Sequence, residues 1–143
     1  MKQIIKNLLD PGNYPQKINL ILLLLRLSVG VFMLSHGLGK FSKLFGDEPI
    51  KFADPIGVGI TPYLALAVFA EVLCSILLIL GIATRLATVP LLTTMLVAAF
   101  IIHASDGFGK QELPLLYSLI YIVIAIMGAG KFSIDNWLSK RFA

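Results

Sequence analysis

TPYLALAVFAEVLCSILLILGI, residues 61–82, sets the fold class of this chain, and Glu71 is its only charged residue. A helix needs about 20 consecutive apolar residues to cross the hydrocarbon core of a bilayer. Thr61 can cap the start of such a helix, and Pro62 suits its first turn, where a backbone N–H has no helical partner. The stretch therefore predicts a membrane-spanning helix over residues 63–82.

Three further apolar segments occur in the chain, at about residues 18–39, 86–103 and 113–130. The composition agrees with this pattern, because 57% of the 143 residues are hydrophobic and 14% are charged. Soluble domains average about a quarter charged residues. The turn at residues 83–85 is so short that the second and third segments should form a tight hairpin. We therefore predict an all-α, polytopic membrane protein whose four transmembrane helices form a bundle.

Both ends of the chain are predicted to lie at the membrane surface. Residues 1–15 place apolar side chains on one helical face and lysines on the other, as in an amphipathic helix at an interface. Residues 133–143 predict a second short interfacial helix, with Trp137 at the depth of the lipid headgroups. The four-helix transmembrane domain then covers residues 16–132.

The distribution of lysine and arginine predicts the orientation of the chain. Cytoplasmic loops of membrane proteins carry an excess of these residues. With the amino terminus inside, the cytoplasmic side receives seven of them: Lys2, Lys6, Lys17, Arg85, Lys131, Lys140 and Arg141. The opposite side receives four: Lys40, Lys43, Lys51 and Lys110. We therefore expect both termini in the cytoplasm.

The sequence contains few of the groups that an independent enzyme needs. Cys74 is the only cysteine, which excludes an internal disulfide and a metal site made of cysteines alone. We find no glycine-rich phosphate loop, nucleophile elbow or CxxC pair, and no motif for flavin, haem or an iron–sulfur cluster. The net charge of +4 comes from basic residues that flank apolar segments, which indicates membrane topology. We therefore expect no intrinsic cofactor and no nucleic-acid partner.

Arg26 and Glu71 are charged residues inside predicted spans. An ionised side chain near the bilayer centre costs a few kcal/mol, so it normally faces the bundle and has a partner. At about 1.5 Å per residue, Arg26 lies about 12 Å and Glu71 about 16 Å from the cytoplasmic ends of their predicted helices. We therefore predict that they touch. The pair either locks two helices in register or forms a pocket for a quinone-like headgroup or for protons, unless each side chain reaches the interface separately.

Gly30 and Gly37 share a face of the first predicted helix with Arg26, at 100° per residue. Small residues in a membrane helix let a second helix approach closely. We therefore expect this face to point into the bundle.

A second polar group is predicted at the outer mouth of the bundle. His36 and Lys40 lie near the outer end of the first span, His103 ends the third, and Glu112 precedes the fourth. These residues either cap helix ends or exchange protons with a bound redox ligand. Two histidines and a glutamate can ligate a metal, but their spacing matches no known ligand pattern, so no metal site is predicted.

Seven short motifs between residues 26 and 135 carry a family resemblance. They are RLSVG at 26–30, HGLGK at 36–40, FADPIGVG at 52–59, AE at 70–71, GIATRLA at 81–87, HA at 103–104 with Glu112, and GKFSID at 130–135. In this order they resemble the DoxX family of four-helix bacterial inner-membrane proteins, in particular its Bacteroidetes-type branch. The resemblance covers over three quarters of the chain.

The resemblance implies a role near the quinone pool of the inner membrane. Related proteins are linked to a subunit of a thiosulfate:quinone oxidoreductase and to a membrane oxidoreductase complex in oxidative-stress defence. We expect an accessory or quinone-interacting subunit of a membrane redox system, at most an oxidoreductase subunit, with a quinone as ligand. Its partners would be the lipid bilayer, a membrane or redox protein, and further copies of the chain. Two alternatives are a non-catalytic scaffold of a larger membrane complex and a proton-coupled small-molecule exporter.

Overall fold

The computed structural model describes residues 9–141, and these residues form helices and connecting segments without any strand. This confirms the predicted all-α class. The α-helices are α2 (Gln16–Phe45), α3 (Ile60–Val68), α4 (Ser75–Leu80), α5 (Thr84–Val97), α6 (Phe108–Met127) and α7 (Ile134–Arg141). Two π-helical segments, η1 (Phe69–Cys74) and η2 (Ala98–Ile102), continue α3 and α5 without a break.

Four helical stretches are long and apolar enough to cross a membrane: Gln16–Phe45, Ile60–Leu80, Thr84–Ile102 and Phe108–Met127. They correspond to the four predicted spans, with different ends. The first stretch continues past the predicted end at residue 39 to Phe45 and ends at Gly46, whose backbone is extended. The last one stops before residue 130 because Gly128 adopts a φ of 83°, a left-handed conformation that ends a helix.

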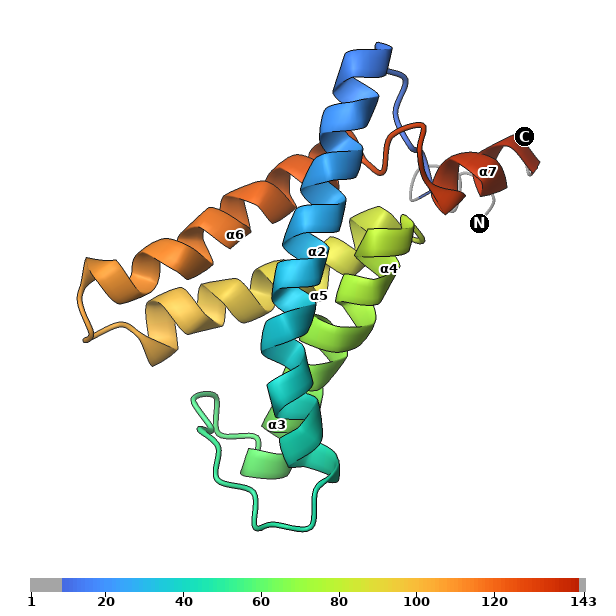
Figure 1. Cartoon of the computed structure of the whole chain (residues 1–143). Coiled ribbons are helices and arrows are strands. Elements are labelled where there is room, and N and C mark those ends of the chain that lie inside the picture. The colour runs from blue at the N-terminus through green and yellow to red at the C-terminus, as the bar shows by residue number, and fades with distance from the viewer. Residues whose placement is uncertain (1–8, 142–143) are drawn as a thin grey trace.

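The two ends of the chain differ in what the structure describes. The predicted amphipathic segment at residues 1–15 lies largely outside the described residues, and the part from residue 9 onward is an irregular segment. At the other end, α7 occupies the predicted interfacial tail (Figure 1). Trp137 of this helix is 57% exposed, and the guanidinium of Arg141 lies 5.3 Å from the centre of its ring.

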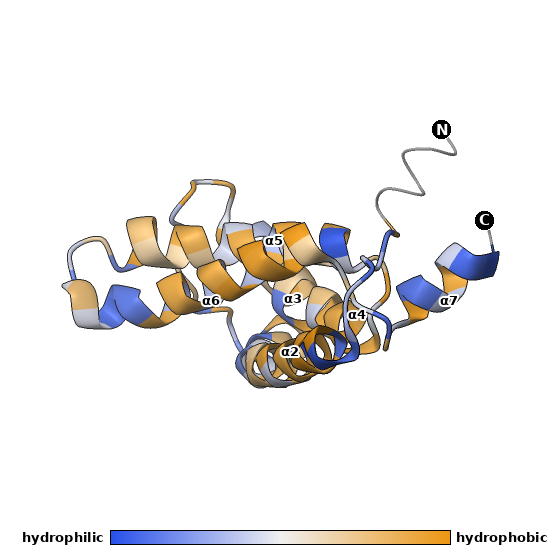
Figure 2. Cartoon of the chain, turned by 90° about the horizontal axis from the view of Figure 1, so that it is seen from above, coloured by the Kyte–Doolittle hydropathy of each residue, from blue (hydrophilic) through white to orange (hydrophobic). Residues whose placement is uncertain are grey.

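The helices are arranged as two antiparallel pairs. The continuous helix α3–η1–α4 packs along α2, and α5 packs along α6. The two pairs diverge: in Figure 2, where α2 is seen nearly end-on, α5 and α6 extend away to one side of it. We call the end with the α4–α5 turn and α7 the terminal end. The opposite side, where the loops at residues 46–59 and 103–107 lie at the separate tips of the two diverging pairs, is called the loop end.

Two glycines set how closely α2 and its partner pack. A Cβ atom on Gly30 would lie 2.5 Å from Cγ1 of Ile79, and one on Gly37 would lie 2.8 Å from the backbone carbon of Glu71. Real Cβ atoms do not approach that closely, so only glycine fits at these positions. The backbones are therefore in contact, and this contact fixes Gly37 opposite Glu71.

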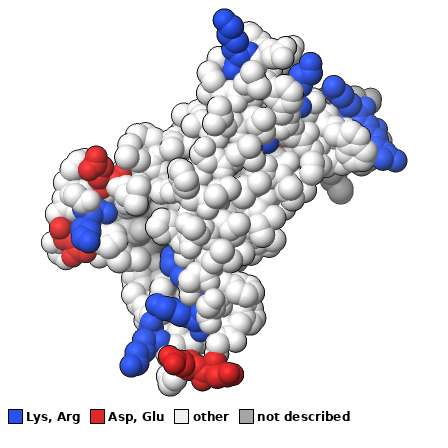
Figure 3. Space-filling model, in the orientation of Figure 1, with Lys and Arg blue, Asp and Glu red and all other residues white. Residues whose placement is uncertain are grey.

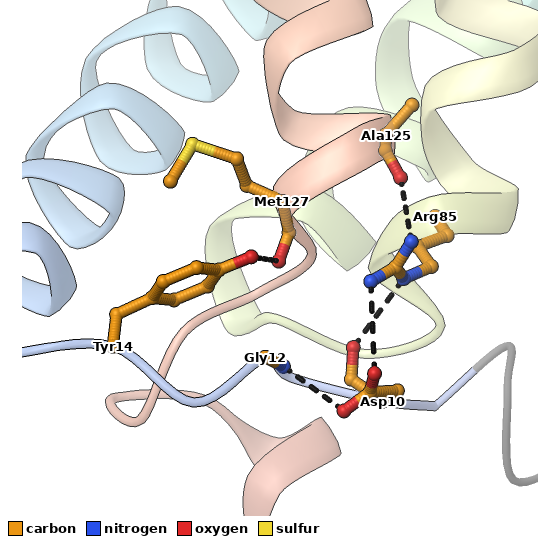
Figure 4. A network of polar contacts seen from close by, with 6 residues as sticks. All are labelled: Asp10, Gly12, Tyr14, Arg85, Ala125 and Met127. Atoms are coloured by element: carbon orange, nitrogen blue, oxygen red, sulfur yellow. Dashed lines mark hydrogen bonds and ion pairs between the residues drawn. The ribbon is translucent and has the colours of Figure 1, made fainter.

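The irregular segment at residues 9–15 ties α2 to the other pair at the terminal end (Figure 4). The Tyr14 hydroxyl donates to the carbonyl oxygen of Met127 at 3.0 Å. Arg85 donates from Nη1 to the carbonyl oxygen of Ala125 at 3.0 Å, and its Nη2 lies 3.9 Å from Oδ2 of Asp10. These contacts hold the two helix pairs together where they converge.

Apolar side chains also cover the outside of the helices. Leu24, Phe32, Leu119 and Ile126 are each more than half exposed, and hydrophobic residues dominate α2, α5 and α6 (Figure 2). Such a surface suits acyl chains, whereas α7 carries several hydrophilic residues. The described chain is therefore a membrane protein in contact with the bilayer.

The close approach at Gly37 makes a testable prediction. Gly37→Ala should lower the free energy of unfolding by about 1–3 kcal/mol, because the new methyl group overlaps the backbone of Glu71. Gly39→Ala is the matched control on the same helix, since nothing lies within 4 Å of the position of its Cβ. The control should leave stability unchanged or raised by up to about 1 kcal/mol. Unfolding by SDS in mixed micelles measures both variants, and equal effects would contradict the close packing.

Candidate functional site

Arg26 does not pair with Glu71, contrary to the sequence-based expectation. Arg26 is 1% exposed and lies beside Gly81, where an added Cβ would be 2.6 Å from its Nη1. Gly81 and Glu71 are ten positions apart along a helix, which corresponds to about 15 Å. The prediction assumed that both helices end at one level, but α2 begins beyond the end of its partner. Arg26 therefore lies at the terminal end, level with the α4–α5 turn.

Arg26 instead fastens the segment that joins α6 to α7. Its Nη1 donates to the carbonyl oxygen of Ala129 at 2.5 Å, and its Nη2 donates to that of Phe132 at 2.8 Å. Nearby, Asp135 accepts hydrogen bonds from the backbone amides of Ala83 at 2.7 Å and Thr84 at 2.9 Å. Asp135 thus caps the start of α5, where a carboxylate also suits the helix dipole. These contacts give Arg26 a structural role.

The partner of Glu71 is Lys40, one helical turn beyond Gly37. Nζ of Lys40 forms an ion pair with Oε1 of Glu71. The Glu71 side chain is 1% exposed and the Lys40 side chain 28% exposed. Oε2 of Glu71 is buried without a hydrogen-bond partner among the described residues. The carboxylate therefore keeps one free acceptor.

A cavity of about 230 Å³ lies beside this ion pair, toward the loop end. Its charged and imidazole side chains come from Glu71, Lys40, His36 and His103, and all four helical stretches contribute to its wall. Among the sequence-predicted residues, the structure thus brings His36, Lys40, His103 and Glu71 together around one space. Glu112 is exposed and is not among the lining residues. Arg26 is not among them either.

Both π-helical segments contribute to this cavity. Glu71 belongs to η1, and Ala98 and Ile102 of η2 line the opposite wall. A π-helical turn inside an α-helix costs regular hydrogen bonding and occurs often at functional sites. The two segments therefore mark the cavity as the part of the helices that departs from regular geometry.

The loop at residues 46–59 covers the cavity with an aromatic ring. Phe52 stacks on Tyr63 with ring centres 5.8 Å apart, and Nζ of Lys40 lies 5.9 Å from the centre of the Phe52 ring. The carboxylate of Asp54 holds this loop by accepting hydrogen bonds from the amides of Val58 at 3.1 Å and Gly59 at 2.7 Å. The FADPIGVG motif is thus a turn that holds an aromatic cover.

His103 is oriented by its neighbours. Its Nδ1 lies 2.8 Å from Oδ2 of Asp106, and its carbonyl oxygen accepts a hydrogen bond from Nε2 of Gln111 at 3.0 Å. The Asp106 contact favours a proton on Nδ1 and leaves Nε2 for a second partner. His36 is exposed on α2 at the same cavity. Among residues 9–141 there is no group of three His, Cys, Asp or Glu side chains that could hold a metal ion.

Sequence reasoning missed the aromatic part of the site. Phe52, Tyr63 and Tyr117 all line the cavity. The two tyrosines are the only available signal, because each places a hydroxyl inside an apolar span. Phe52 had no such signal, since its place over the cavity depends on the turn held by Asp54.

The ion pair predicts a measurable coupling. Lys40→Met should lower the free energy of unfolding by about 1–3 kcal/mol, because it leaves a buried carboxylate without its cation. The double variant Lys40→Met/Glu71→Gln should lose less than the sum of the two single variants. Lys43→Met, at an exposed position one turn further on, is the control. A double-mutant cycle with additive effects would rule out the pairing.

Comparison with known proteins agrees with the motifs. The DoxX family profile matches residues 21–104. A protein of Haemophilus influenzae is 35% identical over 125 residues, covering 82% of this chain and 90% of its own length. An uncharacterized membrane protein of Mycobacterium tuberculosis is 32% identical over 136 residues, covering 82% and 80%.

A Bacillus subtilis protein named "Putative oxidoreductase CatD" is 30% identical over 120 residues, covering 82% of this chain and 87% of its own length. No solved structure matches. The profile match extends over more than half of the chain, and it includes the Lys40–Glu71 pair and the Phe52 cover. The chain described here belongs to the DoxX family.

Proposed function

We propose that this protein is a quinone-interacting subunit of a membrane redox system and that the loop-end cavity holds the quinone headgroup. The observation that carries the proposal is the buried carboxylate of Glu71. Glu71 lines the cavity, and its Oε2 has no hydrogen-bond partner among the described residues. An unpaired buried acceptor costs free energy unless a partner arrives. A ligand with a polar group at this position would supply that partner.

The cavity suits a single flat ring. A cavity of about 150 Å³ holds benzene, and sites for drug-sized ligands run from about 300 to 1,000 Å³. The 230 Å³ here lies between these sizes. Phe52, Tyr63 and Tyr117 offer aromatic surfaces against which a ring can stack.

The polar residues of the cavity suit the proton chemistry of a quinone. A quinone takes up two electrons and two protons, and its two carbonyl oxygens become hydroxyls. Lys40 can donate a hydrogen bond to a carbonyl oxygen, and Glu71 can accept one from a hydroxyl through Oε2. His36 and His103 present imidazole nitrogens that can donate or accept a hydrogen bond. In this proposal the electrons come from a partner protein, a role consistent with the oxidoreductase name of the Bacillus relative.

Ligand binding tests the proposal. Tetramethylbenzoquinone, which has no tail, should bind saturably to the protein in lipid nanodiscs. Glu71→Gln and His36→Ala should each weaken binding by about tenfold, equivalent to about 1.4 kcal/mol. His36 is exposed, so its variant tests the cavity without disturbing a buried charge.

Glu112→Gln is the matched control for the quinone experiment, because Glu112 lies outside the cavity lining. It should leave the dissociation constant unchanged. Absence of saturable binding to the wild type would overturn the proposal and favour the scaffold. Proton release driven by another small molecule and lost in Glu71→Gln would indicate an exporter instead.

We also propose that the protein lies in the bacterial inner membrane with its terminal end in the cytoplasm. The support is electrostatic. At the terminal end, lysine and arginine residues outnumber acidic ones, and Asp10 and Asp135 already contact Arg85 and backbone amides there. On the face seen in Figure 3, both signs occur at the other two ends. By the positive-inside rule, we expect the terminal end to lie in the cytoplasm.

Cysteine labelling tests this orientation. Ser105→Cys lies in an exposed loop at the loop end, and Asn13→Cys is exposed at the terminal end. In right-side-out membrane vesicles, a membrane-impermeant maleimide should label the first variant and not the second. The native Cys74 is buried and serves as the internal background. Labelling of Asn13→Cys alone would reverse the orientation.

A further inference from the structure

An apolar groove runs between α2 and α6 beside the loop-end cavity. It has a volume of about 220 Å³ and is lined from Leu25 to Phe32 on α2 and from Leu113 to Ile120 on α6. Ser28 and the Tyr117 hydroxyl provide its only polar side-chain atoms. The groove therefore offers a hydrocarbon surface between two of the membrane-spanning helices.

The groove and the cavity share a wall. Leu113 and Tyr117 of α6 line both spaces. On α2, Phe32 lines the groove and the next residue, Met33, lines the cavity. A molecule that occupied both would pass between these side chains.

The groove lies where the bundle is least closed. The α2–α6 contact is the weakest among the neighbouring pairs of spanning helices, because the two helix pairs diverge (Figure 1). Phe32 is 59% exposed and Leu116 is 51% exposed, so both rims of the groove face the lipid. Access from the bilayer is thus open on this side.

The opposite side of the cavity is less suitable for a hydrocarbon chain. The space between α3 and α5 has a volume of about 90 Å³, and Thr93, Thr94 and Tyr63 contribute hydroxyl groups to its lining. It shares Tyr63, Ala67 and Thr94 with the cavity. Its size and its hydroxyls favour a small polar group over a tail.

We propose that the ligand of this protein is an amphiphile that enters sideways from the bilayer, with its headgroup in the cavity and its hydrocarbon tail in the α2–α6 groove. The inference rests on the proposed function and specifies the ligand as a membrane-borne, tailed quinone. The polar end meets Lys40 and Glu71, and the tail leaves past Tyr117 toward the lipid. The tail therefore remains in a hydrocarbon environment throughout, and the headgroup never crosses the loop side.

A groove-filling substitution tests the inference. Leu116→Trp places an indole ring in the groove, and Leu116 itself does not line the cavity. In nanodiscs it should weaken binding of a decyl-substituted benzoquinone by about tenfold, and binding of tetramethylbenzoquinone should stay within about twofold of the wild type. Leu119→Trp is the matched control, because Leu119 is 61% exposed on the same helix and lines neither space.

Each outcome of the quinone comparison decides a different point. The tail groove is supported if Leu116→Trp weakens binding of the decyl-substituted quinone only and Leu119→Trp weakens binding of neither quinone. If Leu116→Trp weakens binding of both quinones equally, or of neither, the assignment of the tail to the groove is overturned, while the cavity site stands. If neither quinone binds the wild type, the proposed function fails and this inference fails with it.

A labelling experiment gives a second readout that does not depend on a variant. A quinone with a photoreactive group on its tail should modify the peptide at residues 113–120. Modification of residues 93–97 instead would place the tail between α3 and α5 and overturn the assignment.

Discussion

Backbone contact between α2 and the helix α3–η1–α4 is the constraint on which the rest of the structure depends. Apolar surface gives helices little reason to associate in lipid, so close packing at small residues must supply the attraction. Gly30 and Gly37 allow this packing, and an added methyl group at either position would overlap the partner helix. Because the two backbones interlock there, the register is fixed to within a residue. That register alone determines which charged residues meet inside the membrane.

The register keeps two buried polar clusters apart, and the two clusters have different roles. At the terminal end, Arg26 holds the α6–α7 segment through carbonyl oxygens, and Asp135 caps α5. These partners are backbone groups, so the cluster fastens chain segments to one another, although Arg26 Nε and Thr84 Oγ1 are buried without a partner among the described residues. Toward the loop end, Lys40 and Glu71 pair beside an open cavity and leave one carboxylate oxygen free. A terminal end tied by hydrogen bonds to the backbone and an end with an open polar cavity thus share one bundle.

Because the helix pairs diverge, the polar cavity opens toward the bilayer between α2 and α6. Contacts from Tyr14 and Arg85 close the bundle where the pairs converge, at the terminal end. Away from that end, α6 moves away from α2, and the space between them becomes the cavity and the adjoining groove. The Phe52 loop then covers the cavity on the loop side. The site therefore opens toward the lipid on one side, while the Glu71 carboxylate stays enclosed by protein.

The sequence by itself determined the four spans, the all-α class and the family, because hydrophobic length and short motifs are local properties of the chain. It also identified Glu71, Lys40, His36 and His103 as residues of interest, since charge inside an apolar segment needs a partner. The tertiary structure alone decided the pairing. By sequence, Arg26 was expected to reach Glu71, and Lys40 was expected at the outer mouth. The observed Lys40–Glu71 pair follows from the glycine contacts and from how far α2 extends past its partner. Likewise, the place of Phe52 and the exclusion of Glu112 depend on loop geometry and helix divergence, which arise from contacts between segments distant in the chain.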